Sequence, residues 1–193
     1  MPMFTPLSAL SPLDGRYASS VERLRPFFSE EALIRARVDV EVRYLIALSK
    51  EPGVKELPPM TKRQEQLLGK LVQGFDTDEA KAVKDIERVT RHDVKAVEYY
   101  LKDRIGRIGG LGKRLEFVHF GLTSEDVNNL AYGLLIQGAL RQVVLPGLKD
   151  LVGDIRSLAV SGERIPLLSL THGQAATPTT LGKEFLVFQQ RLE

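Results

Sequence analysis

Cysteine is absent from the 193-residue sequence. Its absence excludes disulfide bonds, thiolate metal ligands and cysteine nucleophiles, and it fits a reducing compartment. The sequence also lacks any run of about 18 consecutive apolar residues, so no membrane-spanning helix is expected. Met1–Leu13 contains no basic segment followed by an apolar stretch, which argues against a signal peptide. Together these absences predict a cytoplasmic protein with no membrane partner.

Neither sign of charge predominates, because the chain has 27 basic and 25 acidic residues and the two signs are interleaved. The formal charge of +2 creates no large electropositive surface, so nucleic acid is not an expected partner and any anionic ligand must be bound locally. Hydrophobic residues make up 43% of the chain, enough for a substantial core at this length. We therefore expect a soluble globular protein.

Apolar residues recur at steps of three and four through most of the chain, which predicts an all-α fold. Thr61 and Thr77 are both placed to cap the amino ends of helices. One segment, 35–44, alternates between charged and apolar residues, a pattern typical of a half-buried strand. We nevertheless predict helix there, because Ser29 begins a good helix start and the apolar residues 45–48 follow without a turn.

The longest helical signal runs from Thr123 to about Ser161, which is roughly 55–60 Å at 1.5 Å per residue. Its apolar residues have the spacing of a helix-bundle seam: Val144, Leu148, Leu151, Ile155 and Leu158. Pro146 and Gly147 should bend this helix, because proline removes a backbone donor and collides with the preceding turn. A seam of this length needs partner helices that the 193 residues do not supply.

The remaining segments are interpreted from their glycine and proline residues. The glycines from Gly106 to Gly112 lack the spacing and context of a phosphate-binding loop and are interpreted as a linker. After Pro166 a polar loop is predicted, and Thr177-Pro178 then has the cap residue and proline of a helix start. That last helix has no stop signal before Glu193, so we expect the chain to be part of a longer protein.

Histidine is the side chain whose ordinary pKa lies nearest neutrality, so a general acid or base is sought first among the three histidines. A metal site is not expected, since the histidines lie far apart and none has a second ligand at helical spacing. His172 lies in a polar segment open to a ligand, although a loop histidine bonded to nearby backbone is the simpler interpretation when it is considered alone. His119, between apolar neighbours, is interpreted as a buried or half-buried packing residue without an assigned role.

Arg91, His92 and Asp93 lie where one predicted helix stops and Asp93 can cap the next. The structural interpretation is a helix junction. The functional interpretation is a ligand site, because an arginine can clamp an anion, a histidine can donate a hydrogen bond and a carboxylate can orient an imidazole.

Two further segments each have both a structural and a functional interpretation. Thr123, with Asp126 three positions later, forms a capping box for the long helix. The hydroxyls of Thr123 and Ser124, at the positive end of that helix, also suit a substrate carboxylate. Asp14-Gly15 is a turn, and the following Arg16 and Tyr17 can hydrogen-bond a phosphate.

Four sequence blocks together resemble the adenylosuccinate lyase family of the fumarase/aspartase superfamily, in order and at the right separations. They are Ser11–Tyr17, His92–Tyr99, Thr123–Leu130 and Thr171–Gln174. The resemblance runs from about Leu7 to the last residue and concerns the amino-terminal part of the family. The first two blocks distinguish the chain from fumarases, aspartases and argininosuccinate lyases.

The resemblance implies a fumarase/aspartase-like helical fold without a cofactor. Residues 1–111 would form the amino-terminal helical domain, and residues 112–193 would form the beginning of a central bundle of long helices. It also implies a homotetramer in which several subunits contribute to each active site. Two positions depart from the family pattern, since Leu170 and Ala175 stand where arginine and proline are usual.

The resemblance also implies roles for the candidate residues. His172 would be the general acid that protonates the departing purine nitrogen, while a serine on a loop beyond Glu193 removes the β-proton. The substrate would be bound by seven residues: Arg16, Tyr17, Arg91, His92, Asp93, Thr123 and Ser124. The reaction implied is release of fumarate from adenylosuccinate, or from the related succinyl-imidazole carboxamide nucleotide, in purine and AMP biosynthesis. These 193 residues by themselves would be inactive, because they lack the base.

Two alternatives remain open at this stage. The chain can belong to another fumarate-releasing lyase, or to a non-catalytic helical oligomerisation module with the same fold. The presence of the serine loop downstream would favour an enzyme, and an assay of adenylosuccinate against argininosuccinate would identify the substrate.

Overall fold

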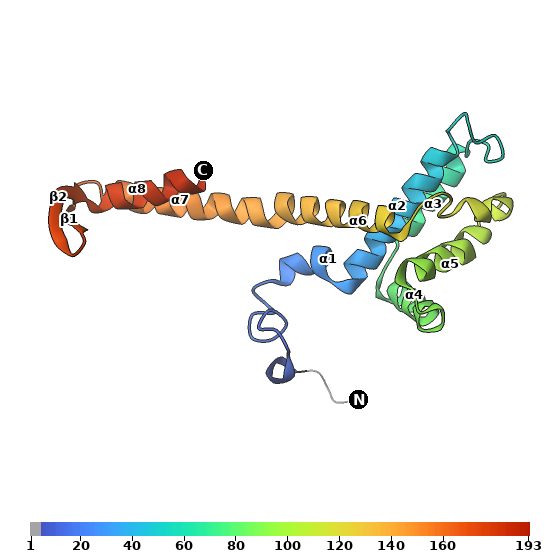
Figure 1. Cartoon of the computed structure of the whole chain (residues 1–193), viewed down its shortest axis with the longest axis horizontal. Coiled ribbons are helices and arrows are strands. Elements are labelled where there is room, and N and C mark those ends of the chain that lie inside the picture. Colours follow the sequence, from blue (N-terminus) through green and yellow to red (C-terminus); the bar gives the residue numbers. More distant parts are fainter. Residues whose placement is uncertain (1–4) are drawn as a thin grey trace. The chain divides into compact units, whose positions relative to one another are not determined.

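The computed structural model describes residues 5–193, which are mostly helical (Figure 1). The chain divides into two compact units, the first ending at Gly138 and the second comprising Ala139–Glu193. The predicted domain boundary at residue 111 concerns a longer protein and stays a prediction.

The first unit contains helices only among its described residues. They are η1 (Pro6–Ser8), η2 (Glu22–Leu24), α1 (Arg25–Phe28), α2 (Glu30–Leu48), α3 (Lys62–Gln73), α4 (Thr77–Thr90), α5 (Asp93–Gly106), η3 (Gly112–Phe117) and α6 (Ser124–Ala139), whose last residue is the first of the second unit. The second unit contains η4 (Leu140–Val144), α7 (Leu145–Ser161), β1 (Pro166–Thr171), β2 (Gln174–Thr180) and α8 (Leu181–Leu192). No helix within residues 5–193 is long and apolar enough to cross a membrane.

Helix α2 is the central helix of the first unit, and the predicted helix over the alternating segment 35–44 is confirmed. Ser29 caps it, since its side chain accepts a hydrogen bond from the Ala32 amide at 3.2 Å. The alternation does not indicate a strand because α2 is buried on more than one side. One side contributes Ile34 and Val38 to the core with α3, α4 and α5, and another side packs on α6.

Two other predicted caps have different outcomes. Thr61 caps α3 with a complete capping box to Gln64, as predicted. The predicted cap of α4 at Thr77 is wrong, because Asp76 is the cap and Thr77 is already helical. The Asp76 carboxylate accepts hydrogen bonds from the amides of Asp78 and Glu79, each at 3.0 Å, which a threonine hydroxyl does not match in charge.

Helices α6, η4 and α7 follow one another without an intervening loop, so the predicted helix from Thr123 to Ser161 is confirmed in its extent. The turns of Leu140–Val144 are π-helical and end two positions before Pro146. Proline has no amide to donate and crowds the preceding turn, and a wider turn at this place relieves both problems. The bend expected at Pro146 stays a prediction.

A β-hairpin replaces the loop predicted after Pro166, and the helix start predicted at Thr177-Pro178 is wrong. Strands β1 and β2 pair antiparallel, with an irregularity between Leu168 and Leu170. Strand β2 continues through Pro178, which a two-stranded sheet tolerates because both strands are edges. Thr180 caps α8 instead, accepting a hydrogen bond from the Lys183 amide at 3.2 Å.

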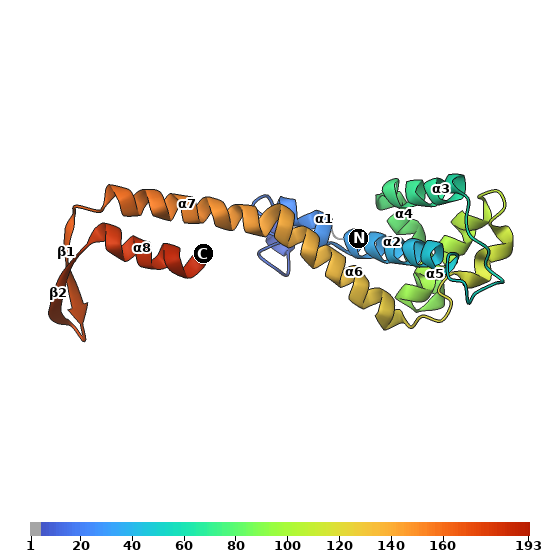
Figure 2. The same cartoon turned by 90° about the horizontal axis from the view of Figure 1, so that it is seen from above.

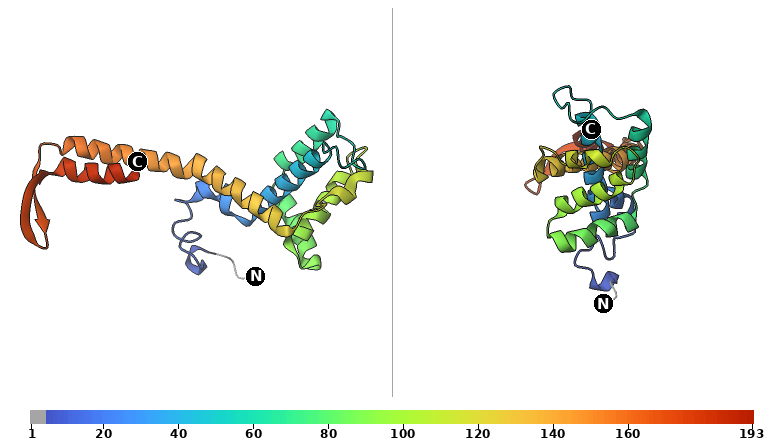
Figure 3. Two further views of the ribbon diagram at one scale, coloured as in Figure 1. Left: turned by 45° about the horizontal axis from the view of Figure 1, so that its top comes forward. Right: turned by 90° about the vertical axis from the view of Figure 1, so that its right-hand side faces the viewer.

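Helix α8 packs alongside α7 in the second unit, as the views in Figures 2 and 3 agree. The two helices approach closely at Gly182, whose amide donates to the carbonyl of Gly162 at 2.9 Å. A Cβ atom at Gly182 would meet the carbonyl of Ala159 and lie 2.7 Å from the amide nitrogen of Glu163. Only glycine fits between these backbones.

Candidate functional site

The junction between α4 and α5 positions Arg91 and His92. Arg91 ends α4 in a left-handed conformation with φ 55°, and His92 is extended. His92 caps α5, since its Nδ1 accepts a hydrogen bond from the Lys95 amide at 3.2 Å. The junction is as predicted, but the cap predicted at Asp93 is wrong. Because Nδ1 is an acceptor, the neutral ring carries its proton on Nε2, which makes Nε2 a donor for a ligand.

The Arg91 guanidinium has no hydrogen-bond or ion-pair partner within residues 5–193. It lines a cavity of about 390 Å³ together with Lys84, Glu87 and Arg88. Lys84 is paired with Glu87 at 2.7 Å and Arg88 is paired with Asp85, so Arg91 supplies the positive charge of the lining that has no ion-pair partner in the described chain. Such a surface suits an anionic group.

The Asp93 carboxylate contacts an arginine rather than the neighbouring imidazole. Its Oδ2 lies 2.7 Å from Arg37 Nη2, and its Oδ1 accepts a hydrogen bond from the Val94 amide at 2.8 Å. The His92 ring does not donate to it, since Nδ1 and Oδ1 are 3.6 Å apart and Nδ1 is already an acceptor. Partial burial alone would raise the pKa of Asp93, but the Val94 hydrogen bond and the Arg37 charge hold that pKa below its ordinary value.

The predicted capping box at the start of α6 is confirmed. Asp126 Oδ2 accepts hydrogen bonds from the Thr123 amide at 2.7 Å and from the Thr123 hydroxyl at 2.8 Å, and the Asp126 amide lies 3.3 Å from that hydroxyl. These hydrogen bonds lower the pKa of Asp126. The Thr123 hydroxyl is thereby occupied, whereas the Ser124 hydroxyl has no hydrogen bond in the described chain. Ser124 is therefore the free donor at this helix end.

Arg37 joins the two blocks, and sequence reasoning did not identify it. Besides its contact with Asp93, its Nε donates a hydrogen bond to Asn128 Oδ1 at 2.9 Å. Its side chain is only 5% exposed. The structure thus brings the start of α5 and the first turns of α6 together through a buried arginine from α2. No sequence signal distinguishes Arg37 from the other charged residues of the alternating segment 35–44.

Two more contacts from α2 hold the loop that leads into α6. His119 has φ 63°, and its Nδ1 is hydrogen-bonded to Glu41 Oε1. The Tyr44 hydroxyl donates to the carbonyl of Phe120 at 2.8 Å. His119 is half-buried, as predicted.

Arg16 and Tyr17 lie in the turns before η2 and contact each other. The Arg16 guanidinium donates to the Tyr17 hydroxyl and lies over the ring, 4.6 Å from its centroid. Within the described residues, no hydrogen bond or ion pair links either residue to Arg91, His92 or Thr123. The structure therefore brings these two together without joining them to the other blocks.

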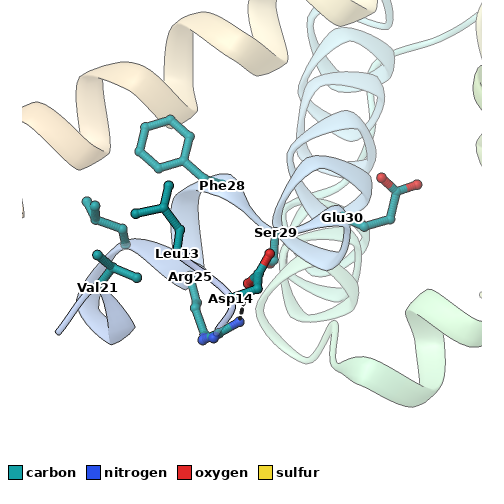
Figure 4. Close-up of a pocket in the computed structure, with 8 residues that line it drawn as sticks. Leu13, Asp14, Val21, Arg25, Phe28, Ser29 and Glu30 are labelled. Atoms are coloured by element: carbon teal, nitrogen blue, oxygen red, sulfur yellow. Dashed lines mark hydrogen bonds and ion pairs between the residues drawn. The ribbon is translucent and has the colours of Figure 1, made fainter. Parts of the chain in front are cut away.

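A cavity of about 640 Å³ lies beside these turns (Figure 4). Its lining is mostly apolar and includes two carboxylates, Asp14 and Glu30. Arg25 reaches Asp14 at 3.5 Å and Glu22 at 2.8 Å, so its charge is compensated. None of the predicted site residues lines this cavity, and its carboxylates do not favour a phosphate.

His172 belongs to the second unit and forms the tip of the β-hairpin. His172 and Gly173 are the two turn residues, with φ 51° and 76°, so both adopt the left-handed conformation of a type I′ turn. The imidazole is exposed and has no hydrogen bond within residues 5–193. The interpretation of His172 as a histidine bonded to nearby backbone is thereby excluded, and its ring is available to a ligand.

No group of three or more histidine, cysteine or acidic residues in the described part of the chain could hold a metal ion. The candidate groups of the first unit are hydrogen-bond donors and a cation at two helix starts, and the candidate group of the second unit is one exposed imidazole. These groups can bind carboxylates and phosphate and can transfer a proton.

The sequence matches the family model described as "Lyase" over residues 15–193. It is 46% identical over 187 residues to the adenylosuccinate lyase of Escherichia coli (strain K12), covering 97% of this chain and 41% of that relative. It is 44% identical over 190 residues to the adenylosuccinate lyase of Dictyostelium discoideum, with the same coverage. The resemblance predicted from the four blocks is confirmed, and the chain spans about two fifths of the length of these relatives.

Two solved structures have a similar fold. Fumarate lyase from Mesorhizobium sp. BNC1 has a TM-score of 0.68 at 19% identity, and 3-carboxy-cis,cis-muconate lactonizing enzyme from Pseudomonas putida has a TM-score of 0.66 at 21% identity. In both cases 89% of this chain and 37% of the other chain are covered. At these identities the likeness concerns the fold alone, and it confirms the predicted helical fold class.

Proposed function

Since this chain belongs to the lyase family matched over residues 15–193, we propose that it is the amino-terminal part of an adenylosuccinate lyase. The observation that carries the proposal is the identity of 46% to such an enzyme over nearly the whole chain. The reaction is β-elimination of fumarate from adenylosuccinate and from the related succinyl-imidazole carboxamide nucleotide. It serves purine and AMP biosynthesis.

His172 is the general acid in this proposal. The C–N bond to the purine breaks, its electron pair goes to the nitrogen, and the His172 imidazolium supplies the proton there. The electron pair of the β C–H bond forms the double bond of fumarate, and a serine outside this chain takes the β-proton. The exposed, unbonded imidazole at the hairpin tip supports this role, because a proton donor must reach the leaving group directly.

The substrate is bound by groups from the first unit. Ser124 and the amino end of α6, with Thr123, hold the succinyl carboxylates. Arg91 and the Nε2–H of His92 bind anionic or carbonyl oxygen, and Asp93 supports them by fixing the start of α5. Arg16 and Tyr17 bind the nucleotide phosphate, which requires the guanidinium to exchange its tyrosine contact for phosphate oxygens.

The active protein in this proposal is a cytoplasmic homotetramer that works without a metal or cofactor. Large apolar side chains lie exposed along the long helices and α8 and suit association with further helices: Leu130, Leu134, Ile136, Leu151, Leu158, Leu186 and Phe188. In such an assembly the residues of one site come from more than one subunit.

The test is fumarate release by the longer protein that contains this chain. Adenylosuccinate should be consumed with a change in purine absorbance, and argininosuccinate should not be consumed. Consumption of argininosuccinate alone would support another fumarate-releasing lyase. No turnover of either substrate by a folded oligomer would support a non-catalytic helical module.

A further inference from the structure

Helix α2 carries three polar side chains on one face, spaced four and three residues apart: Arg37, Glu41 and Tyr44. We call them the α2 polar stripe. Arg37 and Glu41 are 4% and 1% exposed, in a helix whose other buried residues are apolar. Buried charges of this kind are unusual and need a specific reason.

Each member of the α2 polar stripe contacts a segment that leads to a proposed substrate-binding residue. Arg37 binds Asp93, next to His92, and also binds Asn128 in α6. Glu41 is hydrogen-bonded to His119. Tyr44 donates to the carbonyl of Phe120. The last two contacts hold the loop that ends at the capping box of α6.

We propose that the α2 polar stripe is a positioning device for the lyase reaction, which holds the His92 imidazole and the Ser124 hydroxyl at a fixed separation. This proposal rests on the proposed function of the chain. Arg37, Glu41 and Tyr44 do not bind substrate themselves; they act through Asp93, Asn128 and the loop before α6. Fixed geometry of binding groups is worth a large part of a rate enhancement, and small displacements reduce it strongly.

Stability alone gives a poor account of the stripe. Replacing a buried ion pair by well-packed apolar residues is often neutral or stabilising, so a core built only for stability does not require Arg37 or Glu41. Glu41 Oε2 is buried without a hydrogen-bond partner in the described chain, which is itself unfavourable. Burial also raises the pKa of Glu41, against the opposing effect of His119. These unfavourable features favour a positioning role over a purely stabilising one.

The test uses the longer protein that contains this chain, with Arg37→Met, Arg37→Lys, Glu41→Gln and Tyr44→Phe. Arg37→Met keeps the apolar stem of the side chain but loses both hydrogen bonds, so kcat/KM for adenylosuccinate should fall by about 100-fold, with KM raised and kcat lowered. Arg37→Lys should recover part of this loss, because a cation can still reach Asp93. Tyr44→Phe removes only one hydrogen bond and should lower kcat/KM by about 3- to 10-fold.

The matched control is Arg43→Met, on the same helix. Arg43 is 71% exposed in its side chain, and within residues 5–193 its one ion-pair partner is Asp39, at 2.7 Å, so its loss should leave kcat and KM unchanged. If Arg37→Met does not fold, Glu41→Gln and Tyr44→Phe decide the question, since both are nearly isosteric.

Three outcomes separate the possibilities. Folded stripe variants with wild-type kcat/KM per folded molecule would overturn the positioning role while the lyase activity stands. Variants with a lower melting temperature but unchanged KM would overturn it too, because a merely structural residue affects only the folded fraction. A wild-type protein that releases no fumarate would overturn the proposed function and, with it, the positioning role.

Discussion

Arg37 Nη2 and Asp93 Oδ2 lie 2.7 Å apart although the residues are separated by 56 positions in sequence. The guanidinium is buried, with 5% of its side chain exposed, whereas the carboxylate is 45% exposed. The carboxylate can therefore be titrated by solvent while its partner stays charged. Because of this difference in exposure, the contribution of the contact to unfolding free energy can be measured as a function of pH.

Asp93→Asn should remove a stability contribution that is lost in acid. The folded chain holds the pKa of Asp93 below its ordinary value of 3.8, so the contribution is fully present above 3.8 and is lost as pH falls through the lower folded value. The difference in unfolding free energy between wild type and Asp93→Asn should therefore shrink as pH falls below 3.8. Urea unfolding across this range measures it.

Asp154→Asn is the matched control, because Asp154 is exposed and has no partner within residues 5–193. This variant removes a carboxylate without removing a hydrogen bond or ion pair of the described chain. A difference for Asp93→Asn that stays constant with pH would contradict the pairing with Arg37.

Substitutions at His172 should separate chemistry from turn geometry. In the longer protein, His172→Ala and His172→Asn should both lower kcat by about 100-fold or more, because both lack the proton donor. Asparagine tolerates the left-handed conformation that His172 adopts at φ 51°, so His172→Asn should retain about 1 kcal/mol more stability than His172→Ala. A near-normal kcat for His172→Asn would remove the proposed acid role.

Thr123 and Ser124 should respond differently to loss of their hydroxyls. Thr123→Ala breaks the capping box and should cost about 1 kcal/mol of unfolding free energy. Ser124→Ala breaks no hydrogen bond in the described chain and should leave stability unchanged while raising KM for adenylosuccinate. Thermal unfolding and steady-state kinetics on both variants measure this contrast. Equal stability losses with unchanged kinetics would mean that both residues serve only the helix.

Gly182→Ala should destabilise the second unit. The added methyl would meet the backbone of Ala159 and Glu163, so α7 and α8 must separate, at an expected cost of about 1–3 kcal/mol. Gly153→Ala is the control within α7, because no other atom lies within 4 Å of the added methyl. That variant should gain about 0.5–1 kcal/mol, since alanine is the better helix former. Equal changes of melting temperature in Gly182→Ala and Gly153→Ala would contradict the close approach of α7 and α8 at Gly182.

Patterns of neighbouring residues in the sequence correctly predicted structural features that depend on contacts between residues close in sequence. The caps at Ser29 and Thr61 and the extent of the helix from Thr123 to Ser161 depend on neighbours within a few residues. The cap of α4 was assigned one position too late, because Asp76 and Thr77 are adjacent residues that both favour caps.

Contacts over long sequence separations could not be predicted in this way. Thr177-Pro178 has the local pattern of a helix start, yet pairing with Pro166–Thr171 holds the segment in a strand. Arg37 looked like one charge in an alternating segment, and its importance depends on partners 56 and 91 positions away. The candidate residues of the site were identified from sequence blocks, whereas the side chains that hold two of those blocks together were not.

The two-residue turn at His172 and Gly173 also has a consequence for the order of folding. A turn this short closes with little loss of chain entropy, so strand pairing around it can form on the microsecond scale of β-hairpins. An isolated hairpin is only marginally stable, and packing of α7 against α8 must make it persist. The contacts of Arg37 instead require closure of 56- and 91-residue loops, which slows folding. We therefore expect the proposed proton donor to acquire its backbone conformation early, and the proposed substrate-binding junction to form among the last contacts of its unit.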